Sequence, residues 1–332
     1  MTDLAVYFPT FQGLVKAVEG VDLEIRRPEV VGLIGETGCG KTVTAYSLLH
    51  LIPHPGRVVR GEILFQGQNL LSSSAGDLRR IRGKQISMIF QRPMSSLNPL
   101  FSIGTQLLEV IRSHRTSVKR EARDIAIRSM AEVALPDPED IMRRRPFELS
   151  GGMQQRVMIA MALACDTSLL IADEPTTALD VSIQLQILKL IKKIVETRKM
   201  SVLLISHDMS VIGTMCERIN VMYAGSIVES ASKSNIIDRA SHPYSQALLK
   251  AVPGINRPAG ERLAAIDGTV PSLIDPPPGC RFAARCPRVH DPCLERVPPR
   301  VQVSQDHYTS CFSVASTQRA LQNRPCRPAE PA

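Results

Sequence analysis

Gly35-Glu-Thr-Gly-Cys-Gly-Lys41-Thr42 directly follows the apolar stretch from Val30 to Ile34 and precedes a helical pattern that begins near Thr44. Glycines in such a turn let backbone N–H groups face a phosphate, and the helix start adds the positive end of its dipole. Lys41 is expected to reach the β- and γ-phosphates, and Thr42 to ligate Mg²⁺. The stretch therefore predicts an ATP site. Every residue of this phosphate loop is a candidate nucleotide contact: Gly35, Glu36, Thr37, Gly38, Cys39, Gly40, Lys41 and Thr42.

Two carboxylates close another apolar stretch further along the chain. Ser168 to Ala172 is typical of a buried strand, and Asp173 and Glu174 follow it directly. We expect Asp173 to hold Mg²⁺ and Glu174 to polarise the attacking water. His207 comes just after a third apolar stretch, a position from which it can contact the γ-phosphate. These residues favour hydrolysis of the nucleotide over mere binding.

The wider pattern predicts an α/β domain, because apolar strands alternate with longer helical segments up to about residue 240. A helical stretch interrupts this alternation between Gln91 and Leu149 and indicates an inserted helical subdomain. After Leu249 prolines and short loops predominate, so regular structure is expected to be sparse there. The expected buried strands are Val30 to Ile34, Ile86 to Phe90, Leu169 to Ala172 and Val202 to Ser206.

The stretch from Leu149 to Arg156, Leu-Ser-Gly-Gly-Met-Gln-Gln-Arg, resembles the ABC signature. A serine and glycine N–H groups at a helix start form a second anion site, suited to a γ-phosphate presented by another chain. The resemblance to ABC transporter ATPases covers residues 1 to about 235. It implies further nucleotide contacts from the signature and from the D-loop that follows Glu174. These are Ser150, Gly151, Gly152, Gln154 and Asp180.

The same resemblance assigns two more sites. Gln91 follows an apolar strand and matches the Q-loop glutamine, which implies a catalytic role and contact with Mg²⁺. Phe11 is the expected aromatic partner of the adenine ring, with Phe8 and Tyr7 as alternatives. One departure is Pro28-Glu29 where the family usually has Gly-Glu, and it puts no catalytic role in doubt.

Three further features narrow the resemblance to ATPases of oligopeptide, dipeptide and nickel importers. They are the stretch from Ser95 to Phe101, the stretch from His242 to Leu248, and a cysteine- and proline-containing C-terminal segment. The implied fold is a RecA-like α/β core with an N-terminal antiparallel β-subdomain and a helical subdomain near 92–160. The implied boundaries are 1–240 for the ATPase domain, 241–312 for the C-terminal extension and 313–332 for a disordered tail.

The resemblance implies that the chain powers import of peptides from the cytoplasmic face of the cell membrane. The implied partners are a second, related but different ATPase chain, two membrane-spanning permease subunits and an extracytoplasmic substrate-binding protein. Nickel or another small solute is the alternative cargo. A rival function is a soluble ABC ATPase acting on nucleic acid or ribosomes, but the chain lacks a second ATPase unit and an inserted coiled coil. A structural module built on a dead ATPase conflicts with the intact motifs.

Composition gives little support to nucleic acid as a partner. The net charge of +8 is compatible with nucleic acid or an anionic membrane, but clustered arginines are common on solvated helix faces. No tryptophan and 4% aromatic residues leave few stacking platforms for single strands. No apolar run approaches the roughly 20 residues of a membrane span. The first residues lack the pattern of a secretory signal, so we expect a cytoplasmic location.

Four of the eight cysteines gather in the C-terminal segment. Cys280, Cys286, Cys293 and Cys311 have the spacing C-x5-C-x6-C-x17-C, which supplies the four thiolates of a [4Fe–4S] cluster. The C-terminal segment of the resembling family also looks like a cluster-binding one. Zn²⁺ is the alternative, although the tight cysteine pairs usual at structural zinc sites are missing. Four unligated thiols remain a third possibility.

Overall fold

The computed structural model describes residues 1–332 except 92–95, 178, 253–265 and 316–332. Its centre is an eight-stranded sheet in the order β12-β13-β11-β10-β3-β9-β8-β7. The five strands from β10 to β7 run parallel, and β11, β13 and β12 add antiparallel pairs at one edge. The strands are β3 (Val30–Ile34), β7 (Ile86–Ile89), β8 (Leu169–Asp173), β9 (Ser201–Ser206), β10 (Arg218–Tyr223), β11 (Ser226–Ser232), β12 (Arg300–Ser304) and β13 (His307–Ser310).

All four predicted buried strands are present, as β3, β7, β8 and β9. They lie side by side in the parallel part of the sheet, of which β7 is the edge strand, and the burial of most of their side chains explains their continuous apolar runs. Along β3 the side chains alternate between two cores. Val30 and Ile34 belong to the core shared with the helical subdomain, whereas Val31 and Leu33 pack toward the N-terminal strands.

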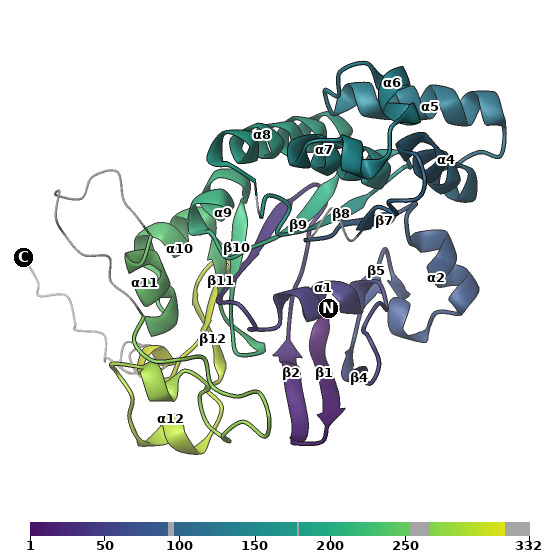
Figure 1. The fold of residues 1–332 in the computed structure, drawn as a ribbon. Coiled ribbons are helices and arrows are strands. Elements are labelled where there is room, and N and C mark those ends of the chain that lie inside the picture. Colours follow the sequence, from purple (N-terminus) through teal and green to yellow (C-terminus); the bar gives the residue numbers. More distant parts are fainter. Residues whose placement is uncertain (92–95, 178, 253–265, 316–332) are drawn as a thin grey trace, which may run out of the picture.

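A second, antiparallel sheet forms the predicted N-terminal β-subdomain. Its order is β2-β1-β4, and a short hairpin of β5 and β6 follows it. Figure 1 shows β1 and β2 projecting below the central sheet, beside α1. The strands are β1 (Thr2–Thr10), β2 (Gly13–Val21), β4 (Arg57–Glu62), β5 (Leu64–Phe65) and β6 (Gln68–Asn69).

The helices cover both faces of the sheet, and α4, α5 and α6 form the predicted helical subdomain at the far end from the N-terminal strands (Figure 1). Apolar side chains one helical turn apart, such as Ile103, Leu107 and Ile111 of α4, are fully buried. The helices are α1 (Lys41–Leu48), α2 (Ala75–Ile81), α4 (Ile103–His114), α5 (Lys119–Glu132), α6 (Pro138–Arg143), α7 (Gly151–Leu163), α8 (Val181–Arg198), α9 (Met209–Met215), α10 (Lys233–Arg239), α11 (Pro243–Lys250) and α12 (Asp291–Glu295), with 3-10 turns at Leu70–Ser72, Pro146–Glu148 and Ala283–Arg285.

The C-terminal extension is more closely joined to the core than its sequence indicates. Short loops do predominate, but β13 pairs with β11 and continues the central sheet. At another edge, the Lys16 N–H donates to the Leu273 carbonyl at 2.8 Å, so a piece of the extension also covers β2. Both edges would otherwise present unpaired backbone groups to water. The sequence prediction missed this because such pairing depends on strands far apart in the chain.

Within the described residues, no helix combines the length and apolar character needed to cross a bilayer. The predicted tail, 313–332, lies almost wholly outside the described residues, as does Ala178 of the D-loop and Ser95 of the segment after the Q-loop.

Candidate nucleotide site

The phosphate loop connects β3 to α1 as predicted. Gly40, directly before α1, has a φ of 104°, and a Cβ there would meet the Ala17 carbonyl oxygen at 2.5 Å. Only glycine fits this turn. Lys41 is buried, and its Nζ donates to the carbonyls of Gly35 at 2.8 Å and Glu36 at 3.0 Å. The lysine charge is therefore held inside the loop, where a phosphate group can replace the two carbonyls as its partner.

Asp173 and Thr42, the two residues expected to bind Mg²⁺, lie close together. Asp173 is 1% exposed, and the Thr42 side chain lies near enough to its carboxylate to act on its pKa. Burial, with the neighbouring charge of Glu174, raises the pKa of Asp173 to about 6, while Thr42 and Lys41 oppose the shift. Its Oδ1 atom is buried and has no hydrogen-bond partner among the described residues. A buried carboxylate oxygen without a partner beside a hydroxyl is a donor set that suits Mg²⁺.

Glu174 is the centre of a hydrogen-bonded cluster. Its Oε2 accepts from the Gln91 amide at 2.8 Å and from the Thr177 hydroxyl at 3.0 Å, and its Oε1 lies 3.1 Å from His207 Nδ1. Burial alone would raise the pKa of Glu174, but hydrogen bonds from His207 and Thr177 outweigh it and lower that pKa. Glu174 itself has a φ of 46°, a strained backbone for a non-glycine residue. The carboxylate is thus ionised, and hydrogen bonds from three side chains fix its orientation.

The structure brings together the three predicted catalytic residues, Gln91, Glu174 and His207, although they come from the ends of three different strands. Thr177 completes the cluster, and no motif or periodicity in the sequence identified it. The parallel order of β7, β8 and β9 explains the meeting, because the carboxyl ends of parallel strands lie at one edge of a sheet.

The signature residues lie apart from this cluster, at the start of α7. Ser150 is exposed and caps the helix by accepting the Met153 N–H, and Gly151 is exposed beside it. Gln154 is 5% exposed, and its amide donates to the carbonyls of Pro146 at 2.8 Å and Leu149 at 3.1 Å. Gln154 therefore supports the loop from within, whereas Ser150 and its neighbouring N–H groups face solvent at a helix N-terminus.

Three other predicted contacts lie in different parts of the fold. Phe11 is fully exposed in the turn between β1 and β2. Asp180 caps α8 by accepting the Ile183 N–H at 2.9 Å. Cys39 is buried, with its sulfur 3.8 Å from Lys41 Nζ. Because the Cys39 side chain faces the protein interior, only its backbone can contact a ligand of the loop.

The predicted iron–sulfur or zinc site is not supported. In the described part of the chain, no three side chains of His, Cys, Asp or Glu are grouped so that they could hold a metal ion. Cys280, Cys286, Cys293 and Cys311 are free thiols in one region, and the Cys280 N–H donates to the Cys293 carbonyl at 2.7 Å. Burial, and then the other three cysteines, raise the pKa of the Cys280 thiol to about 11. The four cysteines are thus free thiols in one region, without the grouping that a metal site requires among the described residues.

A phosphate loop, a buried carboxylate suited to Mg²⁺ and a hydrogen-bonded glutamate at the carboxyl ends of parallel strands are the parts of a nucleotide hydrolase. The signature stretch at the start of α7 adds the feature typical of the ABC class. The ABC transporter family model matches residues 18–177, and the model of the oligopeptide/dipeptide transporter C-terminal region matches residues 228–293. The dimeric post-hydrolysis structure of the ATP-binding cassette MJ0796 with ADP and Pi has a TM-score of 0.63 at 26% identity. The match covers 70% of this chain and 97% of the MJ0796 chain.

Two curated relatives cover nearly the whole chain. The dipeptide transport ATP-binding protein DppD of Bacillus subtilis is 43% identical over 93% of this chain and 92% of its own length. The oligopeptide transport ATP-binding protein OppD of the same organism is 44% identical over 93% of this chain and 87% of its own. This chain belongs to the family of ATP-binding proteins of oligopeptide and dipeptide ABC transporters. It is an ABC ATPase that couples ATP hydrolysis to transport.

Proposed function

We propose that the chain binds Mg-ATP at the phosphate loop and hydrolyses it to power uptake of dipeptides or oligopeptides. The observation that carries the hydrolytic part is the Glu174 cluster, in which Gln91, Thr177 and His207 aim one ionised carboxylate. Mg²⁺ would be held by Thr42 and Asp173, with Gln91 close by, and would neutralise phosphate charge. Glu174 then polarises the water that attacks the γ-phosphate, and His207 orients the carboxylate.

The site is completed by a second ATPase chain in this proposal. Ser150 and Gly151 offer an exposed helix N-terminus that suits the γ-phosphate of a nucleotide on a partner. Phe11 stacks on the adenine, and Asp180 lies where the two chains meet. We propose a related but different chain as the partner. Mass determination of the intact complex tests this, and two identical copies without a second ATPase would contradict it.

The cargo proposal rests on the match of residues 228–293 and on the printed names of the relatives, which are dipeptide and oligopeptide transport proteins. The complex would contain two permease subunits and a substrate-binding protein, with this chain on the cytoplasmic face of the membrane. The deciding experiment reconstitutes the complex and measures which solute stimulates its ATPase. Stimulation by peptides is expected, and stimulation by Ni²⁺ alone would favour the alternative cargo.

We also propose that the four C-terminal cysteines bind an iron–sulfur cluster, which can be measured directly. A cluster on Cys280, Cys286, Cys293 and Cys311 is supported by four free thiols in one loop-rich region, three of which act on the pKa of Cys280. Anaerobically purified protein is expected to contain about four irons and four sulfides per chain. One zinc ion, or a metal-free preparation with four titratable thiols, would overturn the cluster.

A further inference from the structure

An ion pair joins the C-terminal extension to the phosphate loop. Arg285 Nη1 lies 3.1 Å from Oε1 and 3.0 Å from Oε2 of Glu36, the second residue of the loop. The Arg285 side chain is 5% exposed and that of Glu36 is 27% exposed. A pair shielded from water to this degree interacts more strongly than a surface ion pair. The two residues are 249 positions apart, so neither motif indicates the contact.

The rest of the Arg285 guanidinium is also bound. Its Nε donates to the Asp267 carbonyl at 2.8 Å and its Nη2 to the Ile266 carbonyl at 3.0 Å. Nη1 additionally donates to the Tyr223 hydroxyl at 3.2 Å. Because a guanidinium is planar, these bonds fix its orientation. Glu36 is therefore held by a rigid partner and not by a swinging surface side chain.

The backbone of Glu36 is anchored as well. Its N–H donates to the Tyr244 hydroxyl oxygen at 3.0 Å, and Tyr244 is fully buried. The Tyr244 ring packs on Tyr223, with ring centroids 4.6 Å apart, and on Phe282 of the extension at 5.4 Å. Thus the side chain and the main chain of Glu36 are both bound by groups outside the phosphate loop, which are packed on one another.

Resting on the proposed binding of ATP, we propose that Arg285 and Tyr244 are positioning residues that hold the phosphate loop ready for nucleotide. A glycine-rich loop has many accessible conformations, and ordering it costs affinity unless it is ordered beforehand. Glu36 also supplies a carbonyl that accepts from Lys41 Nζ. Fixing Glu36 therefore fixes the start of the loop and the resting place of its lysine. The extension would in this way increase affinity for ATP without touching it.

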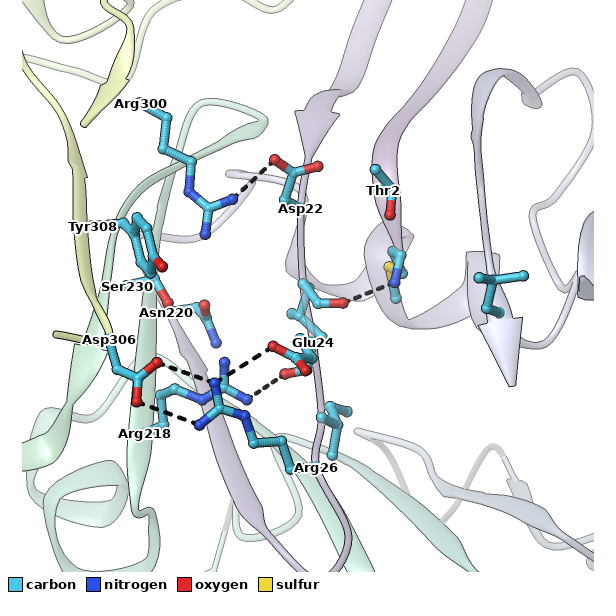
Figure 2. A pocket seen from close by; sticks show the side chains of 14 residues that line it. Thr2, Asp22, Glu24, Arg26, Arg218, Asn220, Ser230, Arg300, Asp306 and Tyr308 are labelled. Atoms are coloured by element: carbon cyan, nitrogen blue, oxygen red, sulfur yellow. Dashed lines mark hydrogen bonds and ion pairs between the residues drawn. The ribbon is translucent and has the colours of Figure 1, made fainter. Parts of the chain in front are cut away.

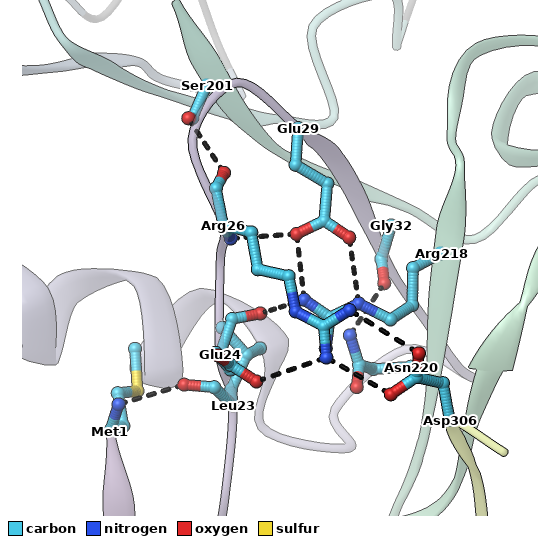
Figure 3. Close-up of polar contacts among 10 residues, drawn as sticks. All are labelled: Met1, Leu23, Glu24, Arg26, Glu29, Gly32, Ser201, Arg218, Asn220 and Asp306. Carbon is cyan, nitrogen blue, oxygen red and sulfur yellow. Dashed lines mark hydrogen bonds and ion pairs between the residues drawn. The ribbon is translucent and has the colours of Figure 1, made fainter.

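Other contacts of the extension provide a matched control. Around a cavity of about 570 Å³, Arg300 pairs with Asp22 at 3.1 Å (Figure 2) and Arg26 with Asp306 at 3.1 Å (Figure 3). These pairs also join the extension to the core, but they are about half exposed and do not involve the phosphate loop. Arg300→Gln therefore removes an interdomain ion pair without disturbing Glu36.

The test measures Mg-ATP affinity of the full-length chain by displacement of a fluorescent trinitrophenyl-ATP. Arg285→Met is expected to weaken affinity about tenfold, the effect of losing one charge-assisted bond pair. Glu36→Gln should weaken it similarly, and the double variant no more than either single one. Arg285→Lys should recover part of the affinity, whereas Arg300→Gln should stay within about twofold of wild type. In the assembled transporter the KM for ATP should rise while kcat at saturating ATP changes less than about twofold.

Circular dichroism separates positioning from folding. If Arg285→Met does not fold, Glu36→Gln still removes the pair without truncating a buried side chain. Unchanged ATP affinity in a folded Arg285→Met or Glu36→Gln variant, or additive losses in the double variant, would overturn the inference and leave the proposed function standing. A wild-type chain that binds no nucleotide would overturn the proposed function and this inference together.

Discussion

The Gln91 amide donates to the Glu174 carboxylate at 2.8 Å, although 83 residues separate the two in the chain. Gln91 lies two residues after the end of β7, on the side of the chain that continues toward the helical subdomain, and Glu174 directly follows β8. A movement of that subdomain that displaces Gln91 therefore removes one of the bonds that aim the carboxylate. We therefore expect a displacement of Gln91 to slow hydrolysis.

Replacing Glu174 with glutamine should leave ATP bound and slow its hydrolysis by a factor of roughly 10² to 10⁴, since the amide cannot accept the water proton. Steady-state phosphate release and nucleotide binding check the two halves of this expectation. Glu196→Gln, on the exposed side of α8, is the control and should hydrolyse normally. Near-normal turnover by Glu174→Gln would remove this residue from the mechanism.

Lys41→Ala should weaken Mg-ATP binding by at least about tenfold, because the charge that meets the phosphates is lost. Its two carbonyl partners, Gly35 and Glu36, also lose their hydrogen bonds. Isothermal titration with Mg-ATP measures the loss. Lys192→Ala, an exposed position of α8, controls for the change in net charge, and equal affinity in the two variants would contradict the assignment.

Ser150→Asp separates helix capping from recognition of a phosphate on the partner chain. Aspartate caps a helix as well as serine does, so stability should change by less than about 0.5 kcal/mol. Its negative charge, however, repels a γ-phosphate presented to Ser150. We expect normal ATP binding by the single chain and loss of ATPase activity in the complex. Ser150→Asn, an uncharged cap, should retain more activity, and full activity of the aspartate variant would exclude this contact.

His242 makes the docking of α11 sensitive to acid. Burial lowers the pKa of His242 from 6.5 to about 4, with the charge of Glu229 opposing the shift. Between these values the unfolded chain binds more protons than the folded one, so stability falls as the pH drops from 6.5 to 4, by about 3 kcal/mol in total. Urea unfolding across this range measures the loss. His242→Asn replaces the ring nitrogen Nδ1, which accepts from the Tyr244 N–H, by an amide oxygen that can accept the same bond, and it should reduce this pH dependence; an unchanged slope would contradict the prediction.

Local patterns in the sequence determined much of this protein. Neighbours within a few residues decide the apolar runs of β3, β7, β8 and β9 and the glycine-rich turn before α1. The sequence therefore predicted these elements and the places of Lys41, Asp173 and His207 beside them. The positions of Glu174 and Gln91 just after two strands were predictable too, that of Gln91 through the family resemblance.

Contacts between distant segments were decided only by the tertiary structure. Thr177 joins the Glu174 cluster, β13 extends the central sheet, and Arg285 with Tyr244 anchors Glu36. Such partners obey no spacing along the chain, because they meet only after the parallel sheet has formed and the extension has packed on it. A motif identifies the reactive residues of one short segment. The orientation of Glu36 and Glu174, however, depends on side chains from distant parts of the chain.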